Sequence, residues 1–133
     1  MKPTLYLIRG VPGSGKSTLA ANLWGTMTVE RVYEADQYFY DDNGVYEFNP
    51  MKLHKAHEQC QRNTRKALSE GLSVAVSNTS CAEWEVETYQ NIAAEFNANF
   101  VSLIVENRHG NENIHGCSDD KVEQMKRKFH VKL

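Results

Sequence analysis

A glycine-rich loop occupies residues 10–17, which read Gly-Val-Pro-Gly-Ser-Gly-Lys-Ser. It follows a short apolar run at 5–9 and leads into a segment at 16–24 that carries apolar residues on one helical face. A strand that passes through such a loop into a helix places the loop backbone at the helix N-terminus, where its N–H groups form an anion-binding hollow. The pattern G-x-x-x-x-G-K-[ST] therefore predicts an α/β domain that binds the phosphates of a nucleoside triphosphate.

Each part of this loop has an expected role. Gly13 and Gly15 allow the backbone to curl so that successive N–H groups point inward. Lys16 is expected to reach the β- and γ-phosphates, and the hydroxyl of Ser17 to ligate Mg²⁺. The predicted cofactors are thus ATP and Mg²⁺. The predicted nucleotide-binding residues are Gly10, Pro12, Gly13, Ser14, Gly15, Lys16, Ser17 and Thr18.

The rest of the chain alternates between strand-like and helix-like segments. Strands are predicted at 5–9, 31–35, 72–76 and 100–105, and helices at 16–24, 49–70, 82–96 and from 118 onward. Within these segments Asn49 is expected to cap a helix that begins at Pro50, residues 42–44 to form a turn, and Trp84 and Tyr89 to lie in the core. This order predicts a three-layer P-loop fold with a mostly parallel sheet of about four to five strands and ligand-binding loops at the strand carboxyl ends.

Composition sets the broad class of the protein. The 133 residues are expected to form one domain, 1–133, with 41% hydrophobic and 24% charged residues. A net charge of −2 argues against a protein that grips nucleic acid over its whole surface. No apolar run approaches the roughly 20 residues of a membrane span, the start lacks a secretory pattern, and the three cysteines show no C-x-x-C spacing. We therefore expect a cytoplasmic protein with no membrane partner; the sequence indicates no particular oligomeric state.

Acidic residues at strand ends bear on the reaction. The third strand ends in Ser77, Asn78 and Thr79, with no acid of the kind that motor and switch P-loop proteins use. The second strand offers Asp36, which could accept the proton of an attacking hydroxyl or hold Mg²⁺ through water. We predict Asp36 as the general base and as a metal-site residue.

A polar segment at 107–117 precedes the last helix and contains Arg108, His109 and His115 between glycines. A basic segment of this kind is typical of a lid that closes on a triphosphate and neutralises the charge that builds up during transfer. Arg108 is the predicted transition-state arginine. A phosphate loop, one acid and a basic lid together indicate a phosphotransferase that acts on a hydroxyl.

Several further segments carry a pattern of their own. They read Glu34-Ala35-Asp36-Gln37-Tyr38-Phe39, Tyr46-Glu47-Phe48-Asn49-Pro50, Ala56-His57, Asn78-Thr79 followed by Trp84-Glu85, and Asn113-Ile114-His115-Gly116. Together with the loop they resemble, in order and spacing over nearly the whole chain, the polynucleotide-kinase-like P-loop proteins, which include bacteriophage 5′-hydroxyl polynucleotide kinases and small phage and bacterial relatives. The resemblance implies a parallel sheet with a substrate tunnel beside the loop and a hydroxyl-bearing acceptor such as a nucleotide or nucleic-acid end. For a phage-encoded chain the location would be the host cytoplasm.

The resemblance also implies site residues. Lys16 and Ser17 would hold phosphates and metal, Asp36 would act as base, and His57 would line the substrate pocket. Other predicted substrate residues are Asn78 and Thr79 at the third strand end, and Tyr38, whose ring could stack on a nucleobase.

Three positions depart from the pattern of the resembled family. Gln37 and Ser77 stand where relatives show aspartates, and Glu112 stands where the lid pattern has an arginine, for which Arg108 is a substitute four residues upstream. These departures leave two alternatives to a nucleoside, nucleotide or polynucleotide kinase. One is an ATP-binding regulatory module with little turnover, and the other is a kinase of hydroxymethylated bases in phage DNA.

Overall fold

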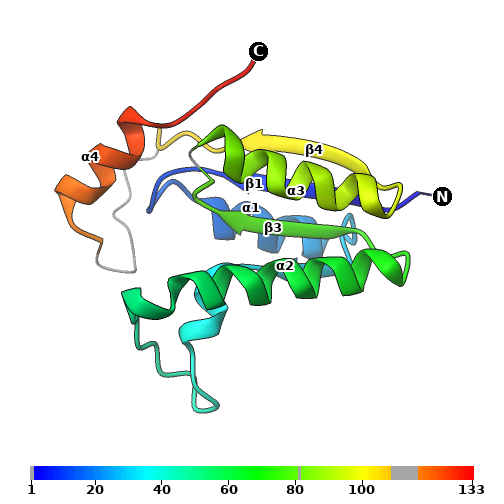
Figure 1. The fold of residues 1–133 in the computed structure, drawn as a ribbon, viewed down its shortest axis with the longest axis horizontal. Coiled ribbons are helices and arrows are strands. Elements are labelled where there is room, and N and C mark those ends of the chain that lie inside the picture. The colour runs from blue at the N-terminus through cyan, green and yellow to red at the C-terminus, as the bar shows by residue number, and fades with distance from the viewer. Residues whose placement is uncertain (1, 81, 109–116) are drawn as a thin grey trace.

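The computed structural model describes residues 2–80, 82–108 and 117–133. Its centre is a sheet of four parallel strands in the order β2-β3-β1-β4 (Figure 1). The strands are β1 (Thr4–Arg9), β2 (Arg31–Tyr33), β3 (Val74–Asn78) and β4 (Asn99–Ile104). The central pair, β1 and β3, is almost wholly buried, as expected of parallel strands that are covered on both faces.

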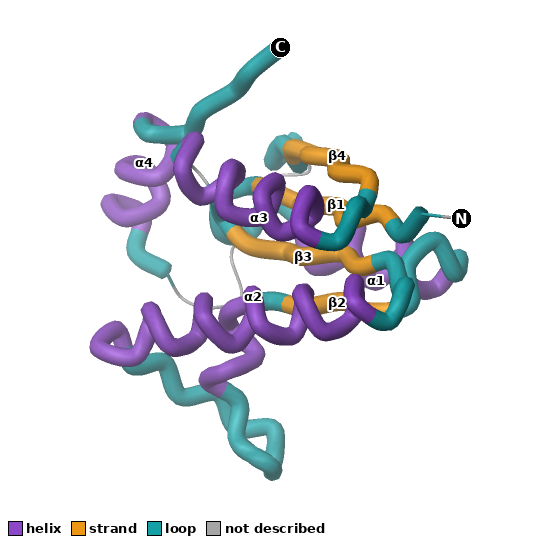
Figure 2. Tube along the Cα trace, turned by 45° about the vertical axis from the view of Figure 1, so that its right-hand side comes forward, coloured by secondary structure: helices purple, strands orange, loops and turns teal. Residues whose placement is uncertain are grey.

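Helices cover both faces of the sheet, so the domain has three layers (Figure 2). On one face α1 (Lys16–Gly25) packs through Ala20 against Ile8 and Ala75. On the other face α2 (Leu53–Ser69) and α3 (Glu83–Glu95) pack against Leu5, Leu7 and their neighbours on β3. The last helix, α4 (Asp119–Arg127), lies beyond the carboxyl ends of the strands (Figure 1). The predicted three-layer α/β fold with a parallel sheet is confirmed.

The second strand is shorter than predicted. It ends at Tyr33, and Ala35–Phe39 forms a 3₁₀ turn instead of a continued strand. The physical reason is a side chain from the neighbouring strand, because the N–H of Ala35 donates to Oδ1 of Asn78 at 2.9 Å in place of a backbone carbonyl. The carboxyl ends of β2 and β3 are thereby tied together.

The segment before α2 follows the prediction in part. Residues 40–46 form a small hairpin with an antiparallel bridge between Tyr40 and Tyr46, and Gly44 takes a positive φ of 78° in the predicted turn. Asn49 caps the next element through a bond from the N–H of Met51 to its side chain, at 3.0 Å. The first turn after this cap, Pro50–Lys52, is 3₁₀, so the α-helix itself begins at Leu53.

The prediction for α3 was right for one aromatic residue and wrong for the other. Tyr89 is 3% exposed and belongs to the core, whereas Trp84 is 69% exposed. At about 100° per residue, Trp84 lies on the side of the helix opposite Val86 and Tyr89, which face the sheet. The sequence stripe contained both rings, but only one falls on the buried face.

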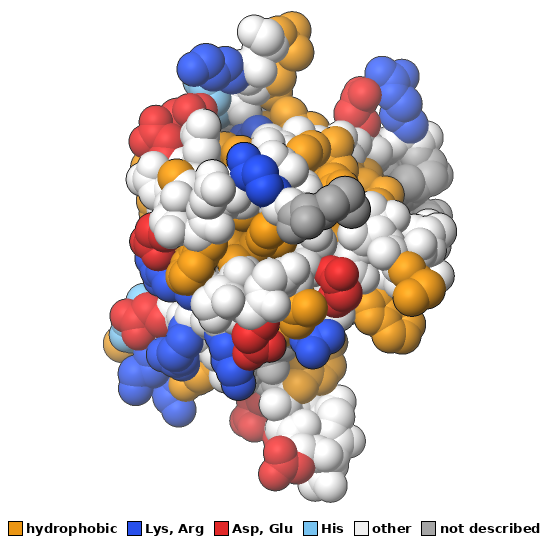
Figure 3. All heavy atoms as spheres, turned by 90° about the vertical axis from the view of Figure 1, so that its right-hand side faces the viewer, with side chains coloured by type: hydrophobic (Ala, Val, Ile, Leu, Met, Phe, Trp, Pro, Cys, Tyr) orange, Lys and Arg blue, Asp and Glu red, His pale blue; other side chains and the backbone are white. Residues whose placement is uncertain are grey.

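The two ends of the parallel strands differ in what lies there. At the amino ends, basic and acidic side chains lie beside one another (Figure 3). At the carboxyl ends lie the phosphate loop, the 3₁₀ turn after β2, the N-terminus of α3 and the last helix (Figure 1). Among the helices of the described residues, none combines the length and the apolar character needed to cross a membrane.

Candidate functional site

The phosphate loop has the backbone that its glycines predict. Gly13 and Gly15 adopt positive φ angles of 84° and 101°, which other residues rarely take. Gly15 is the N-cap of α1 and has no side chain to bond the N–H groups of the first turn. No side-chain cap at Gly15 stands between these N–H groups and a ligand, and the positive end of the helix dipole favours an anion there.

A third glycine is required by close packing. A Cβ atom on Gly10 would lie 2.3 Å from Oγ of Ser14 and 2.9 Å from the carbonyl oxygen of Val105. Ser14, in the same loop, is completely buried. Gly10 therefore packs closely between Ser14 and the residue that follows β4, and this packing fixes the position of the loop relative to the sheet.

The two reactive side chains of the loop bond to different partners. Nζ of Lys16 donates to the carbonyl oxygen of Val11 at 3.4 Å, so the ammonium group lies over the loop. Oγ of Ser17 donates to Oε1 of Glu34 at 2.5 Å. Thr18 is exposed and Pro12 half-buried at the rim of the loop. The carboxylate that reaches the serine is therefore Glu34, which the sequence analysis did not select.

Asp36 lies in the 3₁₀ turn that follows β2. Its Oδ1 accepts a hydrogen bond from the hydroxyl of Tyr46 at 3.3 Å. Burial, reinforced by the negative charge of Asp36 and by this bond, raises the pKa of Tyr46 to about 12. The phenol therefore stays protonated at neutral pH and acts as a donor to the carboxylate. Sequence reasoning did not find this role of Tyr46, although its hairpin was predicted.

His57 on α2 lies near the same acid. Burial lowers the pKa of His57 below its ordinary value, and the charges of Glu85 and Asp36 oppose this effect in part. The ring of Tyr38 contacts that of Phe39 edge-on, with 5.4 Å between centroids. The structure thus brings together Asp36, Tyr46 and His57 on the side of the loop where β2 ends.

The two residues predicted at the end of β3 are engaged with the protein. Oδ1 of Asn78 accepts the N–H of Ala35, and Nδ2 of Asn78 lies 3.5 Å from the hydroxyl of Tyr89. The carbonyl oxygen of Thr79 accepts the N–H of Gly10 at 3.4 Å. Both residues join strand ends around the loop. A contact of either with substrate stays a prediction.

Arg108 follows the end of β4 and forms an ion pair with Glu106, at 2.9 Å between Nη2 and Oε2. Both side chains are largely exposed, at 83% and 65%. The role of Arg108 in transfer stays a prediction. His109, His115 and Glu112 fall in 109–116, so most of the predicted lid lies outside the described residues.

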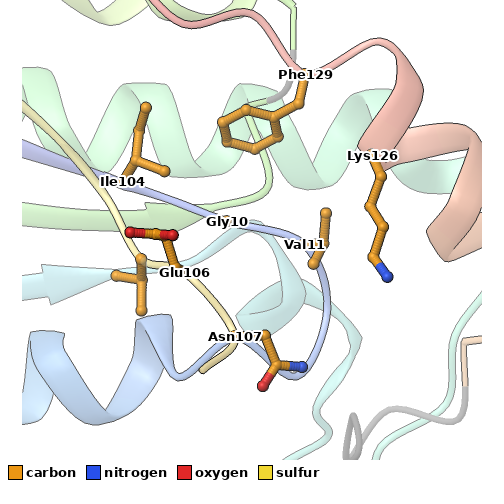
Figure 4. A pocket seen from close by; sticks show the side chains of 8 residues that line it. Gly10, Val11, Ile104, Glu106, Asn107, Lys126 and Phe129 are labelled. Carbon is orange, nitrogen blue, oxygen red and sulfur yellow. The ribbon is translucent and has the colours of Figure 1, made fainter. Parts of the chain in front are cut away.

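A pocket of about 340 Å³ opens on the β4 side of the loop (Figure 4). Phe129 and Lys126, from the last helix and the residues after it, face the end of β4 across the loop backbone (Figure 4). The volume falls within the range of about 300–1,000 Å³ common for small-molecule sites. The lining residues are Gly10, Val11, Ile104, Val105, Glu106, Asn107, Lys126 and Phe129.

A buried arginine holds one wall of this pocket. Arg9 is 4% exposed; it donates through Nε to the carbonyl oxygen of Ser80 at 2.9 Å and through Nη2 to that of His130 at 2.6 Å. Its guanidinium also lies 4.8 Å from the ring centroid of Phe129. A second link joins His130 to Glu83 at the start of α3, at 2.8 Å. The residues after α4 are thus bonded to β1, the strand that leads into the phosphate loop.

Two side chains with oxygen donors meet at the start of α1. Ser17 and Glu34 present a hydroxyl and a carboxylate at the N-terminus of α1, and such oxygen donors suit Mg²⁺. Within residues 2–80, 82–108 and 117–133, no cluster of three or more His, Cys, Asp or Glu side chains could hold a metal. Mg²⁺ commonly binds through one or two carboxylates together with substrate phosphates and water, so the Ser17–Glu34 pair fits such a site.

Comparison with known proteins gives a family and a fold. Residues 5–111 match the family model described as an AAA domain. The chain is 33% identical over 131 residues to NEDD4-binding protein 2 of Homo sapiens, a match that covers 91% of this chain and 7% of that protein. It therefore spans only a small part of that relative's length.

Solved structures share the fold at low identity. The Mycobacterium tuberculosis APS kinase CysC in complex with AMPPNP and APS superposes with a TM-score of 0.62, at 16% identity over 79% of this chain and 63% of that chain. A chain of the Pnkp1/Rnl/Hen1 RNA repair complex superposes with a TM-score of 0.63, at 18% identity over 78% of this chain and 33% of that chain. The domain thus has a P-loop kinase-like fold.

Proposed function

The chain belongs to the AAA domain family. We propose that it is an ATP- and Mg²⁺-dependent kinase that phosphorylates a hydroxyl of a nucleoside, nucleotide or nucleic-acid end. One observation carries the proposal. The phosphate loop with Lys16 and the hydrogen-bonded pair of Asp36 and Tyr46 lie at the carboxyl ends of strands of one parallel sheet. A donor-binding element and an acid suited to an acceptor hydroxyl thus share one edge.

On the donor side, the N–H groups at the start of α1 and the ammonium of Lys16 would bind the β- and γ-phosphates. Ser17 would hold Mg²⁺, which neutralises phosphate charge when bound. The pocket beside β4 would receive the rest of the nucleotide, with Phe129 as an apolar wall. AMPPNP in the CysC structure supports this assignment of a nucleotide, because the fold is the same.

On the acceptor side, Asp36 would orient the hydroxyl and take its proton. The hydroxyl oxygen forms a bond to the γ-phosphorus, the bond from that phosphorus to the β–γ bridging oxygen breaks, and ADP leaves. Tyr46 holds the carboxylate of Asp36 in place through its hydrogen bond. His57, whose pKa responds to the charge of Asp36, would line the acceptor site. A polynucleotide acceptor is supported by the neighbour in an RNA repair complex, at the level of fold.

The test is transfer of label from γ-labelled ATP to a panel of 5′-hydroxyl oligonucleotides, nucleosides and hydroxymethylated DNA. Lys16→Ala should slow transfer about 10²- to 10³-fold, because a lost charge at the developing transition state costs on the order of 3–4 kcal/mol. Asp36→Asn should slow transfer strongly, while Asp42→Asn, a matched change in the exposed hairpin tip, should leave it unchanged. Full turnover by Asp36→Asn would show that another group is the base.

The second candidate is an ATP-binding regulatory module, and the absence of an acid on β3 favours it. It predicts tight nucleotide binding without transfer to any member of the panel. That outcome, with binding lost in Lys16→Ala, would replace the kinase proposal.

A further inference from the structure

Strand β3, which lies beside the strand that leads into the phosphate loop, carries no carboxylate that could bind a metal ion. P-loop NTPases commonly hold Mg²⁺ with the loop serine or threonine and an aspartate on a neighbouring strand. Here β3, which pairs directly with β1, has Ser77 near its end. Ser77 is 4% exposed, and its Oγ has no hydrogen-bond partner within the part of the chain that the structure describes. Ser77 lies two residues after Ala75 on the same strand, so both side chains point to the face that α1 covers.

The carboxylate at the loop serine comes instead from the end of β2. Oε1 of Glu34 accepts a hydrogen bond from Oγ of Ser17 at 2.5 Å. Its backbone is fixed by bonds on the following turn. The N–H of Ala35 is bound by Asn78, and the carbonyl oxygen of Glu34 accepts the N–H of Gln37 at 3.2 Å. Glu34 is half-buried, so its carboxylate is positioned against the loop rather than free in solvent.

We propose that Glu34 supplies the carboxylate of the Mg²⁺ site, directly or through a metal-bound water, and so takes the place of the missing acid on β3. This inference rests on the proposed nucleotide-binding function. A Ser17 hydroxyl that donates its hydrogen bond to Glu34 keeps its oxygen lone pairs for a cation. The negative charge of Glu34 also partly offsets that of the cation, as a carboxylate does in oxygen-ligand Mg²⁺ sites.

This role has a signature that a purely structural role lacks. Without a metal, Glu34 repels a triphosphate bound at the start of α1, because the two negative charges would share one helix N-terminus. With a metal, the same carboxylate attracts the cation that the phosphates carry. Removing the charge of Glu34 should therefore strengthen metal-free nucleotide binding and weaken metal binding.

The test compares the wild-type chain with Glu34→Gln and with Glu70→Gln, a matched change at the exposed end of α2. Mn²⁺ serves as the probe, and its free concentration is read from its electron paramagnetic resonance signal in the presence of AMPPNP. We expect Glu34→Gln to weaken Mn²⁺ binding to the nucleotide complex about 10- to 100-fold, the range seen when supporting groups of metal sites are removed. Calorimetric titration of AMPPNP in EDTA should show equal or tighter binding, and Glu70→Gln should match wild type in both assays.

The outcomes separate this inference from the proposed function. If wild type binds AMPPNP and Mn²⁺ but Glu34→Gln binds Mn²⁺ equally well, Glu34 is only a charge that stabilises the start of α1, and the inference is overturned. If wild type binds no AMPPNP with or without metal, the proposed function itself fails. Weaker binding of nucleotide by Glu34→Gln in EDTA as well as in Mn²⁺ would indicate a damaged loop and would also overturn the inference.

Discussion

Replacing Arg9 by methionine should both destabilise the domain and loosen the nucleotide pocket. Arg9 is buried at the end of β1 and donates to the carbonyl oxygens of Ser80 and His130, while its guanidinium stacks on Phe129. Methionine fills a similar volume but donates nothing. The change therefore removes these bonds without creating a large cavity.

The expected magnitude follows from the exposure of each partner. Ser80 is 3% exposed, so its carbonyl would lose a partner without gaining water, at a cost of about 1–3 kcal/mol. His130 is exposed, and water can bind its carbonyl instead. The contact with Phe129 is worth about 1 kcal/mol. Relief from burying a charge offsets part of the loss, so we expect a decrease of about 2 kcal/mol in the free energy of unfolding.

Urea unfolding followed by circular dichroism measures this change, and Arg65→Met is the control. Arg65 pairs with Glu95 on the surface, with side chains 43% and 49% exposed, so its replacement should cost no more than about 1 kcal/mol. Arg9→Met should also weaken AMPPNP binding, since Phe129 lines the pocket. An Arg9→Met protein no less stable than Arg65→Met would refute the view that Arg9 fastens the chain end to the strand.

Three other substitutions give separate tests. Gly10→Ala should destabilise the loop and abolish nucleotide binding because its Cβ would lie 2.3 Å from Oγ of Ser14, whereas Gly25→Ala, with no atom within 4 Å, should be neutral or stabilising in the same urea assay. Because burial holds the pKa of His57 below 6.5, the native state binds fewer protons than the unfolded state, and stability should fall as pH drops below 6.5; His57→Gln should flatten this loss in unfolding curves measured from about pH 5 to 8. Ser77→Ala should raise the free energy of unfolding by about 1 kcal/mol, since it removes a buried hydroxyl that lacks a partner among the described residues, and a clear loss of stability would contradict this account.

Much of the fold was predictable because its signals are local. The phosphate loop, the hairpin around Gly44 and the Asn49 cap each depend on residues a few positions apart, and the structure has all three, although the turn that Asn49 caps is 3₁₀. The end of β2 was not predictable in this way. It depends on a bond from Ala35 to Asn78, which lies 43 residues away in the sequence.

The same limit applies to the candidate site. Arg9 stands out in the sequence only as a charged residue at the end of an apolar run, and its partners lie 71 and 121 residues away. Tyr46 belongs to a segment quoted only for its resemblance, because its bond to Asp36 depends on how the hairpin folds back on the 3₁₀ turn. Residue types and spacing located the edge of the sheet where the site lies, but long-range bonds decide which side chains face one another.

The early end of β2 separates the two acids that follow it, Glu34 and Asp36. In a continuing strand, residues 34 and 36 would point to the same face, and either could serve both the metal and the acceptor. In the structure Glu34 keeps an extended backbone and Asp36 lies in the 3₁₀ turn, so the two side chains no longer follow the alternation of one strand. Accordingly Glu34 contacts Ser17 on the donor side, and Asp36 contacts Tyr46 on the other. The two changes should therefore be separable: Asp36→Asn should lose phosphate transfer yet keep Mn²⁺ affinity, and Glu34→Gln should lose Mn²⁺ affinity first. Equal loss of Mn²⁺ affinity in both variants would contradict this separation and would support the predicted metal role of Asp36.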